Sequence, residues 1–184
     1  ASVMMFSQKA LEIIENRKTP IPSYYMNLKR WKEVMEDPSI YLATPAVQVM
    51  LALKVSFEMI LEEGLENRWR RHKHIAKAIR AGIESLNFEF VAEKEHRADT
   101  VTGFYVPKGK SFEIRHNMKE KYKVEVAKGF GKITKDSLRV GHFGNINKES
   151  VETFLTALEK TTTQYRTNKE ENIALTAASS FLDY

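Results

Sequence analysis

The stretch "YLATPAVQVMLALKVSFEMILEEGLENRWRRHKHIAKAIRAGIESL", residues 41–86, decides the fold of this 184-residue chain. Residues 46–63 are apolar almost all round, which predicts a helix that is buried on more than one side. Thr44 is a suitable N-cap for this helix, and Pro45 fits its first turn. Residues 65–86 carry apolar side chains on one side only, which predicts a second, amphipathic helix.

Beyond residue 86 the helical period gives way to short runs of β-branched and aromatic residues, which are typical of strands. The predicted class is α/β, with an α+β domain built on a mostly antiparallel sheet of three or four strands. Helices cover one face of this sheet, and the two long helices precede it. The predicted strands are residues 88–91, 100–107, 124–126 and 137–143, and the predicted helices are residues 111–122 and the segment that Asn147 caps.

The segments outside this block are less regular. Residues 1–6 carry no charge and predict a short buried strand. Ser7 is placed to cap a short helix over about residues 7–16, and residues 27–36 predict another helix. The tail after residue 163 is polar and then weakly apolar, so a docking helix and disorder are both open.

The composition excludes several classes of protein. The chain has no cysteine, so it forms neither disulfides nor thiolate metal sites, and a cytoplasmic location is expected. Its five histidines show no metal-ligand spacing, and no apolar run is long enough to cross a bilayer. The net charge of +5, from 29 basic and 24 acidic residues, is a modest excess. We therefore expect no metal, no membrane and no nucleic acid among the partners.

The densest basic run is "RWRRHKH", residues 68–74. On a helix its charges point in different directions, which favours a solvated helix surface. The alternative is a stand-alone interaction module whose basic surface binds an acidic partner or nucleic acid. An affinity that falls steeply with salt and depends on Arg68, Arg70 and Arg71 would favour that alternative.

Arg139 is the residue most clearly suited to chemistry. It stands between Leu138 and Val140 in a short apolar run within "KGFGKITKDSLRVGHFGN", residues 128–145. A guanidinium in such a strand needs an anionic partner, and its planar fork suits bidentate capture of a carboxylate. A strand arginine that faces solvent, or that pairs with a structural glutamate, is equally compatible with the spacing.

Several motifs, in order along the chain, resemble one known family. They are "SYYMNLKRW", "YLATPAVQVMLALK", "TVTGFYVP", "VEVAKGFGK" and "LRVGHFGN". The chain thereby resembles the C-terminal half of the class V pyridoxal-phosphate aminotransferases, the alanine–glyoxylate and serine–pyruvate aminotransferase family. The resemblance implies transfer of an amino group between alanine or serine and glyoxylate or pyruvate, with pyridoxal 5'-phosphate as cofactor. Another class V activity stays open, although no cysteine is present to act in sulfur transfer.

The resemblance also implies roles for three residues. Arg139 matches the arginine that anchors the substrate α-carboxylate. Tyr41 and Thr44 match the pair that reaches the cofactor phosphate of the neighbouring subunit, so a homodimer with a shared active site is implied. Lys128 stands where many relatives carry glycine, which puts the shape and charge of the site entrance in doubt.

Lys9, in "FSQKAL", looks like the lysine that holds the cofactor covalently, but the register of the later motifs places it downstream of that lysine. The Schiff-base lysine is expected upstream of Ala1, and this piece alone is expected to be inactive. The division that follows from the resemblance has four parts. They are a remnant of the large cofactor domain and interface segment (1–45), connecting helices (46–86), a C-terminal small domain (87–163) and an unassigned tail (164–184).

Overall fold

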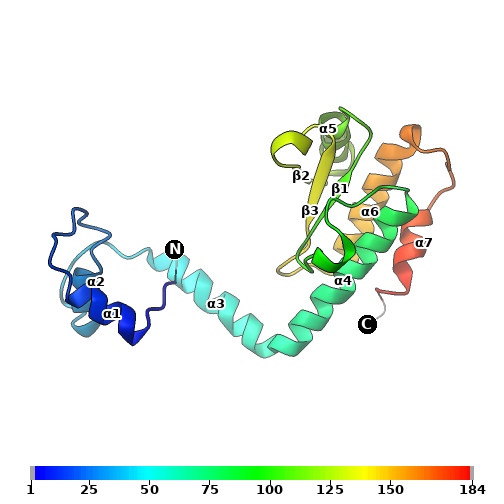
Figure 1. Ribbon diagram of the computed structural model, residues 1–184. Coiled ribbons are helices and arrows are strands. Elements are labelled where there is room, and N and C mark those ends of the chain that lie inside the picture. Colours follow the sequence, from blue (N-terminus) through cyan, green and yellow to red (C-terminus); the bar gives the residue numbers. More distant parts are fainter. Residues whose placement is uncertain (1–2, 183–184) are drawn as a thin grey trace. The chain divides into compact units, whose positions relative to one another are not determined.

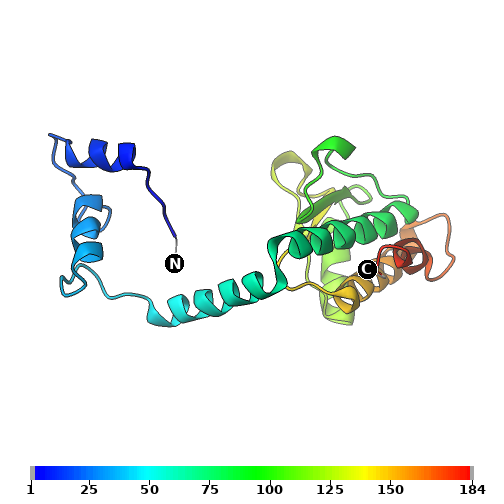
Figure 2. The same ribbon diagram turned by 90° about the horizontal axis from the view of Figure 1, so that it is seen from below.

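The computed structural model describes residues 3–182 and divides the chain into two compact units, Ala1–Glu62 and Glu63–Tyr184. Each unit is held together by its own contacts, and both are drawn in Figures 1 and 2. The four-part division expected from the sequence stays a prediction. No helix in the described part of the chain combines the length and the apolar character that a membrane span requires.

The first unit consists of helices and extended segments. The side chain of Ser7 caps the first helix by accepting from the amide of Ala10, as predicted. The ammonium of Lys29 donates to the carbonyl of Glu15 at 2.8 Å and so joins the first two helices. The Trp31 indole donates to the carbonyl of Tyr25 at 2.7 Å. The helices are α1 (Gln8–Glu15), α2 (Leu28–Glu36) and α3 (Val47–Glu63, whose last residue belongs to the second unit).

Two predictions for this unit are wrong. Residues 3–6 form no strand and are exposed, while residues 1–2 lie outside the described residues. Helix α3 begins at Val47, because its first amide-to-carbonyl bond runs from Met50 to Ala46. Pro45 therefore precedes the helix, and Thr44 is not its N-cap.

The second unit contains the sheet and the helices that cover it (Figure 1). It starts with the amphipathic helix that the sequence predicts, and Gly64, with a φ of 79°, separates this helix from α3. The helices are α4 (Leu65–Ser85), α5 (Ser111–Tyr122), α6 (Lys148–Thr162) and α7 (Ile173–Ser179), and the strands are β1 (Val101–Tyr105), β2 (Ala127–Lys128) and β3 (Ser137–Gly141). Three short 3₁₀ turns, η1 (Lys94–His96), η2 (Gly131–Ile133) and η3 (Thr163–Tyr165), complete it.

The sheet is antiparallel with the order β1-β3-β2, which confirms the predicted class. Two of the four predicted strands are displaced. Residues 88–91 contribute a single bridge, from Phe90 to Phe104. Residues 124–126 complete the end of α5, where Lys123 is left-handed and the amide of Val124 donates to Met118. Pairing with β3 therefore starts only at Ala127.

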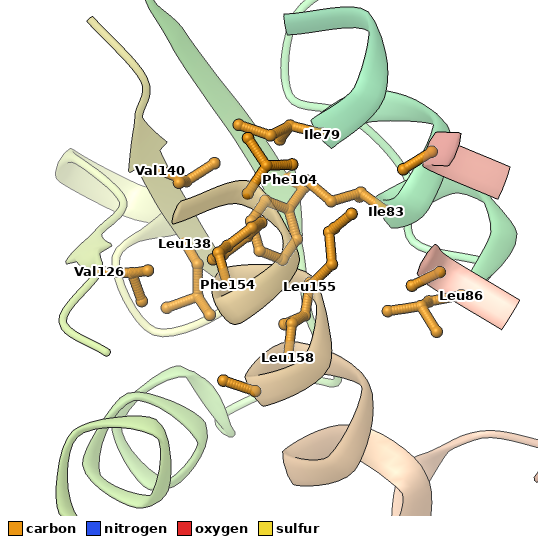
Figure 3. Close-up of a cluster of buried hydrophobic side chains, with 14 of the residues drawn as sticks. Ile79, Ile83, Leu86, Phe104, Val126, Leu138, Val140, Phe154, Leu155 and Leu158 are labelled. Carbon is orange, nitrogen blue, oxygen red and sulfur yellow. The ribbon is translucent and has the colours of Figure 1, made fainter. Parts of the chain in front are cut away.

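The core lies between one face of the sheet and the helices α4 and α6 (Figure 3). Alternate residues of β1 and β3 point into it, as a period of two requires. Phe104 and Leu138 are fully buried there and meet the α6 residues Leu155 and Leu158. Because the helices cover only this face, the odd-numbered residues of β3 occupy the other.

The tail is ordered as a docking helix, one of the two outcomes that the sequence leaves open. Helix α7 packs on α4 and α6, with Ala174 and Ala178 fully buried (Figure 2). Gly82 permits this approach, because a Cβ there would lie 2.5 Å from Leu155 and 3.1 Å from the carbonyl of Ala174. The carboxylate of Glu159 accepts from the amide of Ala174 at 2.9 Å and fixes the start of the helix.

Candidate functional site

Arg139 lies at the centre of β3, on the sheet face that the helices leave uncovered. Its neighbours along the strand, Leu138 and Val140, point into the core, so the alternation of the strand turns Arg139 outward. The residues paired with it across the sheet are Gly103 on β1 and Ala127 on β2. These are the two smallest residue types, and the side chain of Val91 lies over Gly103, at 3.4 Å from where a Cβ would stand.

Two contacts hold the Arg139 side chain in one orientation. Its Nε donates to the carbonyl of Lys128 at 2.9 Å, and its Cζ lies 3.6 Å from the centre of the Phe130 ring. Within residues 3–182 neither terminal nitrogen has a hydrogen-bond acceptor, and no carboxylate pairs with the group. The alternative in which Arg139 pairs with a structural glutamate is therefore not found among the described residues. The guanidinium keeps two parallel donors for a ligand.

The loop that carries Phe130 is tightly built. A Cβ at Gly129 would lie 2.0 Å from the Ser137 hydroxyl, so only glycine fits beside β3 at this position. The same hydroxyl donates to the carbonyl of Ile133 at 2.6 Å and closes the turn that contains η2. The Phe130 side chain nevertheless remains largely exposed, because the turn presents it on the open side of the sheet.

The loop that follows β3 is held by the basic run of α4. The Arg71 guanidinium donates to the carbonyls of Gly144 and Ile146 and also pairs with Glu63. His72 accepts from the amide of Gly144 at 3.2 Å. Arg68 also pairs with Glu63, at 3.0 Å. The interpretation of this run as a solvated surface is therefore wrong for these residues, since they bind the loop and the end of α3.

Tyr41 and Thr44 are brought together immediately before α3. The Tyr41 hydroxyl lies 2.6 Å from the Thr44 hydroxyl, and the tyrosine side chain is largely exposed. Two adjacent hydroxyls in front of a helix start form a donor set that suits a phosphate group. These residues belong to the first unit and Arg139 to the second, so the structure describes them as two separate parts of the predicted site.

Lys9 lies in the first turn of α1. Its side chain is exposed, and no hydrogen bond or ion pair within the described residues holds it. That Lys9 is not the lysine that holds the cofactor stays a prediction.

Sequence reasoning missed Phe130. The motif "GFG" indicates a flexible turn, and the aromatic ring between its two glycines received no role. The usable signal was an aromatic residue in a turn that directly precedes a strand arginine, because such a ring can stack on the guanidinium face. The carbonyl of Lys128 as acceptor could not be foreseen, since it depends on the pairing register of β2.

Comparisons with known proteins identify the relatives of the chain. No protein-family model matches it. An uncharacterized aminotransferase of Methanocaldococcus jannaschii is 34% identical over 154 residues, which cover 83% of this chain and 40% of that protein. The alanine–glyoxylate aminotransferase of Felis catus is 30% identical over 174 residues, which cover 91% of this chain and 42% of the relative.

Solved structures agree with these relatives. The ureidoglycine–glyoxylate aminotransferase of Bacillus subtilis superimposes with a TM-score of 0.90 over 97% of this chain and 47% of its own, at 26% identity. An alanine–glyoxylate aminotransferase of Nostoc sp. gives a TM-score of 0.78 over 84% of this chain and 42% of its own, at 27% identity. The resemblance to the alanine–glyoxylate aminotransferase family is thus confirmed, and the chain spans about two-fifths of the length of the curated relatives it matches.

Proposed function

We propose that this chain, whose relatives are aminotransferases over most of its length, is the C-terminal part of a class V pyridoxal-phosphate aminotransferase. The complete enzyme transfers an amino group between a small amino acid, alanine or serine, and a 2-oxo acid, glyoxylate or pyruvate. The printed names of several relatives, which are alanine–glyoxylate or serine–glyoxylate aminotransferases, support these substrates. The cytoplasmic location remains a prediction.

Arg139 is the observation that carries this proposal. In the proposed complex with substrate, the two terminal nitrogens of the Arg139 guanidinium donate to both oxygens of the substrate α-carboxylate. The bond from Nε to Lys128 and the stacking on Phe130 support the proposal, because they orient the fork before a substrate arrives. Since Nε is occupied, the acid must bind at the end of the fork rather than along its side.

Pyridoxal 5'-phosphate, when bound, supplies the electron sink that amino-group transfer requires. The residues of this chain that would hold its phosphate are Tyr41 and Thr44, and their 2.6 Å hydroxyl contact supports that role. In the proposal they serve the cofactor of the neighbouring subunit, and the lysine that holds the cofactor lies outside this chain. Covalent attachment of pyridoxal phosphate to Lys9 of the isolated chain, trapped by borohydride, would contradict this assignment.

The proposed enzyme is a homodimer. Helix α3 supports this, because large apolar side chains cover it and none of its residues is buried within the described chain. Such residues are unusual on a free surface and are typical of an interface. Sedimentation of the full-length protein should therefore give twice the subunit mass, and a monomer that retains full activity would contradict the shared site.

The test of Arg139 uses the full-length enzyme that contains this chain. Changing Arg139→Gln should lower kcat/KM by about one to two decades, since a charged bidentate contact contributes about 1.5 to 3 kcal/mol. Arg139→Lys should recover little of this loss, because an ammonium cannot bind both oxygens in one plane.

Arg97 provides a matched control for this test. Its Nε donates to the carbonyl of Ala92 at 3.0 Å and its guanidinium lies 4.1 Å from the Phe90 ring, so its two local contacts are of the same kind. Arg97 precedes β1 and takes no part in the proposed site. Arg97→Gln should leave kcat/KM unchanged, and equal losses in both variants would mean that Arg139 acts only on folding.

A further inference from the structure

One cavity in the described part of the chain is lined by residues that take no part in the surroundings of Arg139. It has a volume of about 420 Å³ and is lined by the last turn of α5, the end of α6 and the segment after it. Three lysines, Lys121, Lys160 and Lys169, contribute to its wall, and no acidic residue of the described chain does. None of the three ammonium groups has an ion pair or hydrogen-bond acceptor within residues 3–182.

A buried hydroxyl adds a second, independent observation. Thr161 lines the same cavity, is more than nine-tenths buried, and its Oγ1 has no hydrogen-bond partner. A buried polar atom normally has a partner, and leaving it without one is unfavourable. The neighbouring Thr162 on α6, by contrast, has a partner within the helix, because its hydroxyl donates to the carbonyl of Leu158 at 2.7 Å. The hydroxyl of Thr161 therefore lacks a partner within the described residues, and because Oγ1 is itself enclosed, it meets a ligand only when the wall of the cavity moves apart.

The local charge is positive even after its surroundings are counted. The C-terminal ends of α5 and α6 meet here, and each contributes about half a negative charge. Lys160 and Lys169 also line a small adjoining cavity together with Glu159 and Glu171. Glu159 is already bound to the amide of Ala174 and lies 4.0 Å from the Arg166 guanidinium. Three ammonium groups thus exceed the remaining negative charge.

We propose that this cavity is a binding site for a small molecule that carries a phosphate group. Lys121, Lys160 and Lys169 neutralise the phosphate, the Thr161 hydroxyl and the Asn117 amide donate to its oxygens, and the Tyr122 ring borders the organic part. The volume lies within the range of about 300 to 1,000 Å³ that is usual for small-ligand sites. The site does not depend on the aminotransferase assignment, since none of its residues belongs to the proposed active site.

The experiment is an NMR titration of the 184-residue chain with inorganic phosphate and with glycerol 3-phosphate, against sodium chloride at equal ionic strength. The amide signals of Asn117, Thr161 and Gln164 should shift with saturation for both phosphate probes, and more tightly for the ester. Lys160→Gln should weaken binding about fivefold, because one exposed charged contact is lost. Lys94→Gln, the same change on the exposed turn η1, should leave it unaltered.

Equal shifts with chloride, or equal weakening by the Lys94 variant, would reduce the site to general charge screening and overturn the proposal. Binding only to a single-stranded RNA oligomer, with a steep dependence on salt, would overturn it in favour of a polyanion surface.

Thr161→Val separates a ligand-binding role of the hydroxyl from a structural one. Without phosphate the variant should unfold at the same temperature as the parent chain or higher, because a buried hydroxyl without a partner is replaced by a methyl group of similar shape. The rise in Tm that phosphate causes in the parent chain should be smaller in the variant. An identical phosphate-induced rise in both proteins would exclude Thr161 from the site.

Discussion

Helices α3 and α4 follow one another in the chain and have opposite environments within it. In α4, the isoleucines Ile75, Ile79 and Ile83 recur every four residues and are almost completely buried. In α3 no residue is buried, and Leu51 and Leu61 are 59% and 77% exposed. The helix with the higher apolar content is thus the one that its own chain leaves uncovered.

The difference shows what an apolar pattern can predict. A one-sided stripe specifies which face a helix buries, and in α4 the sheet, α6 and α7 provide the covering surface. An apolar pattern on all sides predicts burial without naming the partner. The expectation that α3 is buried on more than one side is wrong for the described chain, and the proposed dimer is where its apolar surface would be covered.

The first prediction measures this contrast and has the largest expected effect. Ile83→Ala in α4 should lower the free energy of unfolding by about 2 to 5 kcal/mol, since it opens a cavity in a fully buried site. Leu61→Ala in α3 should change it by less than about 0.5 kcal/mol in the isolated chain, because the side chain is exposed there. Urea unfolding followed by circular dichroism gives both values.

The two tryptophans allow each unit to be followed separately, because Trp31 lies in the first unit and Trp69 in the second. Fluorescence of a Trp31→Phe chain reports on the second unit, and that of a Trp69→Phe chain on the first. Ile83→Ala should move only the transition reported by Trp69. A common shift of both transitions would mean that α3 and α4 unfold as one cooperative element, which would remove the contrast.

The second prediction concerns pH and applies to the second unit alone. Burial, and after it the charge of Arg80, lowers the pKa of His142 from an ordinary value of 6.5 to about 4. Between these values the unfolded chain binds a proton that the folded unit does not, so stability falls as the pH is lowered through this window. The loss from this group should approach about 3 kcal/mol at pH 4.

The measurement is urea unfolding of the Trp31→Phe chain at several values between pH 7 and pH 4. His142→Gln should flatten the dependence between pH 6.5 and pH 4, whereas the exposed His116→Gln should leave it as it is. A pH profile that survives the His142 substitution would show that another group titrates in this window.

The third prediction tests the close packing of α6 and the tail helix α7 against α4 at Gly82. Glycine to alanine inside a helix normally stabilises it, but at Gly82 the added Cβ would overlap Leu155 and approach Ala174. Gly82→Ala should therefore destabilise the second unit by about 1 to 3 kcal/mol. In a Leu155→Ala background the same change should be nearly neutral or stabilising, and additive losses in the double variant would contradict the overlap.

These contrasts also indicate what could be predicted from the sequence. The predictions of the amphipathic helix α4, of the helix at 111–122 and of the Asn147 cap are correct because their signals are local. For the two helices the signal is the spacing of apolar residues along the sequence, and for the cap it is a side chain that accepts from Ser150. The strand at 124–126 was misplaced because a left-handed Lys123 delays the start of pairing, and residue types alone do not specify that backbone state.

The candidate site likewise has parts that the sequence predicts and parts that it does not. Arg139 was identified from its place between two apolar residues, and the structure places it outward in the middle of β3. The ring of Phe130 was missed, since its position depends on how the loop from 129 to 136 folds back over the sheet. The link from Arg71 to the loop carbonyls was also missed, because it joins residues more than seventy positions apart.

The last and smallest effect is expected at Glu63, the residue that ends α3 and touches the start of α4. The hydrogen bond from Arg71 lowers its pKa, with further contributions from the Arg71 charge and from Arg68. A carboxylate with a lowered pKa stabilises the fold above its ordinary pKa and loses this effect as the pH falls through the folded value. Glu63→Gln should lower the free energy of unfolding by about 1 to 2 kcal/mol at pH 7. The effect is no larger because the Arg71–Glu63 ion pair is partly exposed to solvent.

Glu62→Gln makes the same change one residue earlier, at an exposed position of α3 without an ion pair in the described chain. It should alter the free energy of unfolding by less than about 0.5 kcal/mol. The difference between the two variants, measured by urea unfolding at pH 7, should shrink at acid pH as the parent Glu63 becomes protonated. If the difference persists there, Glu63 acts through its shape rather than its charge, and the arginines of α4 need no anionic partner to hold the loop after β3.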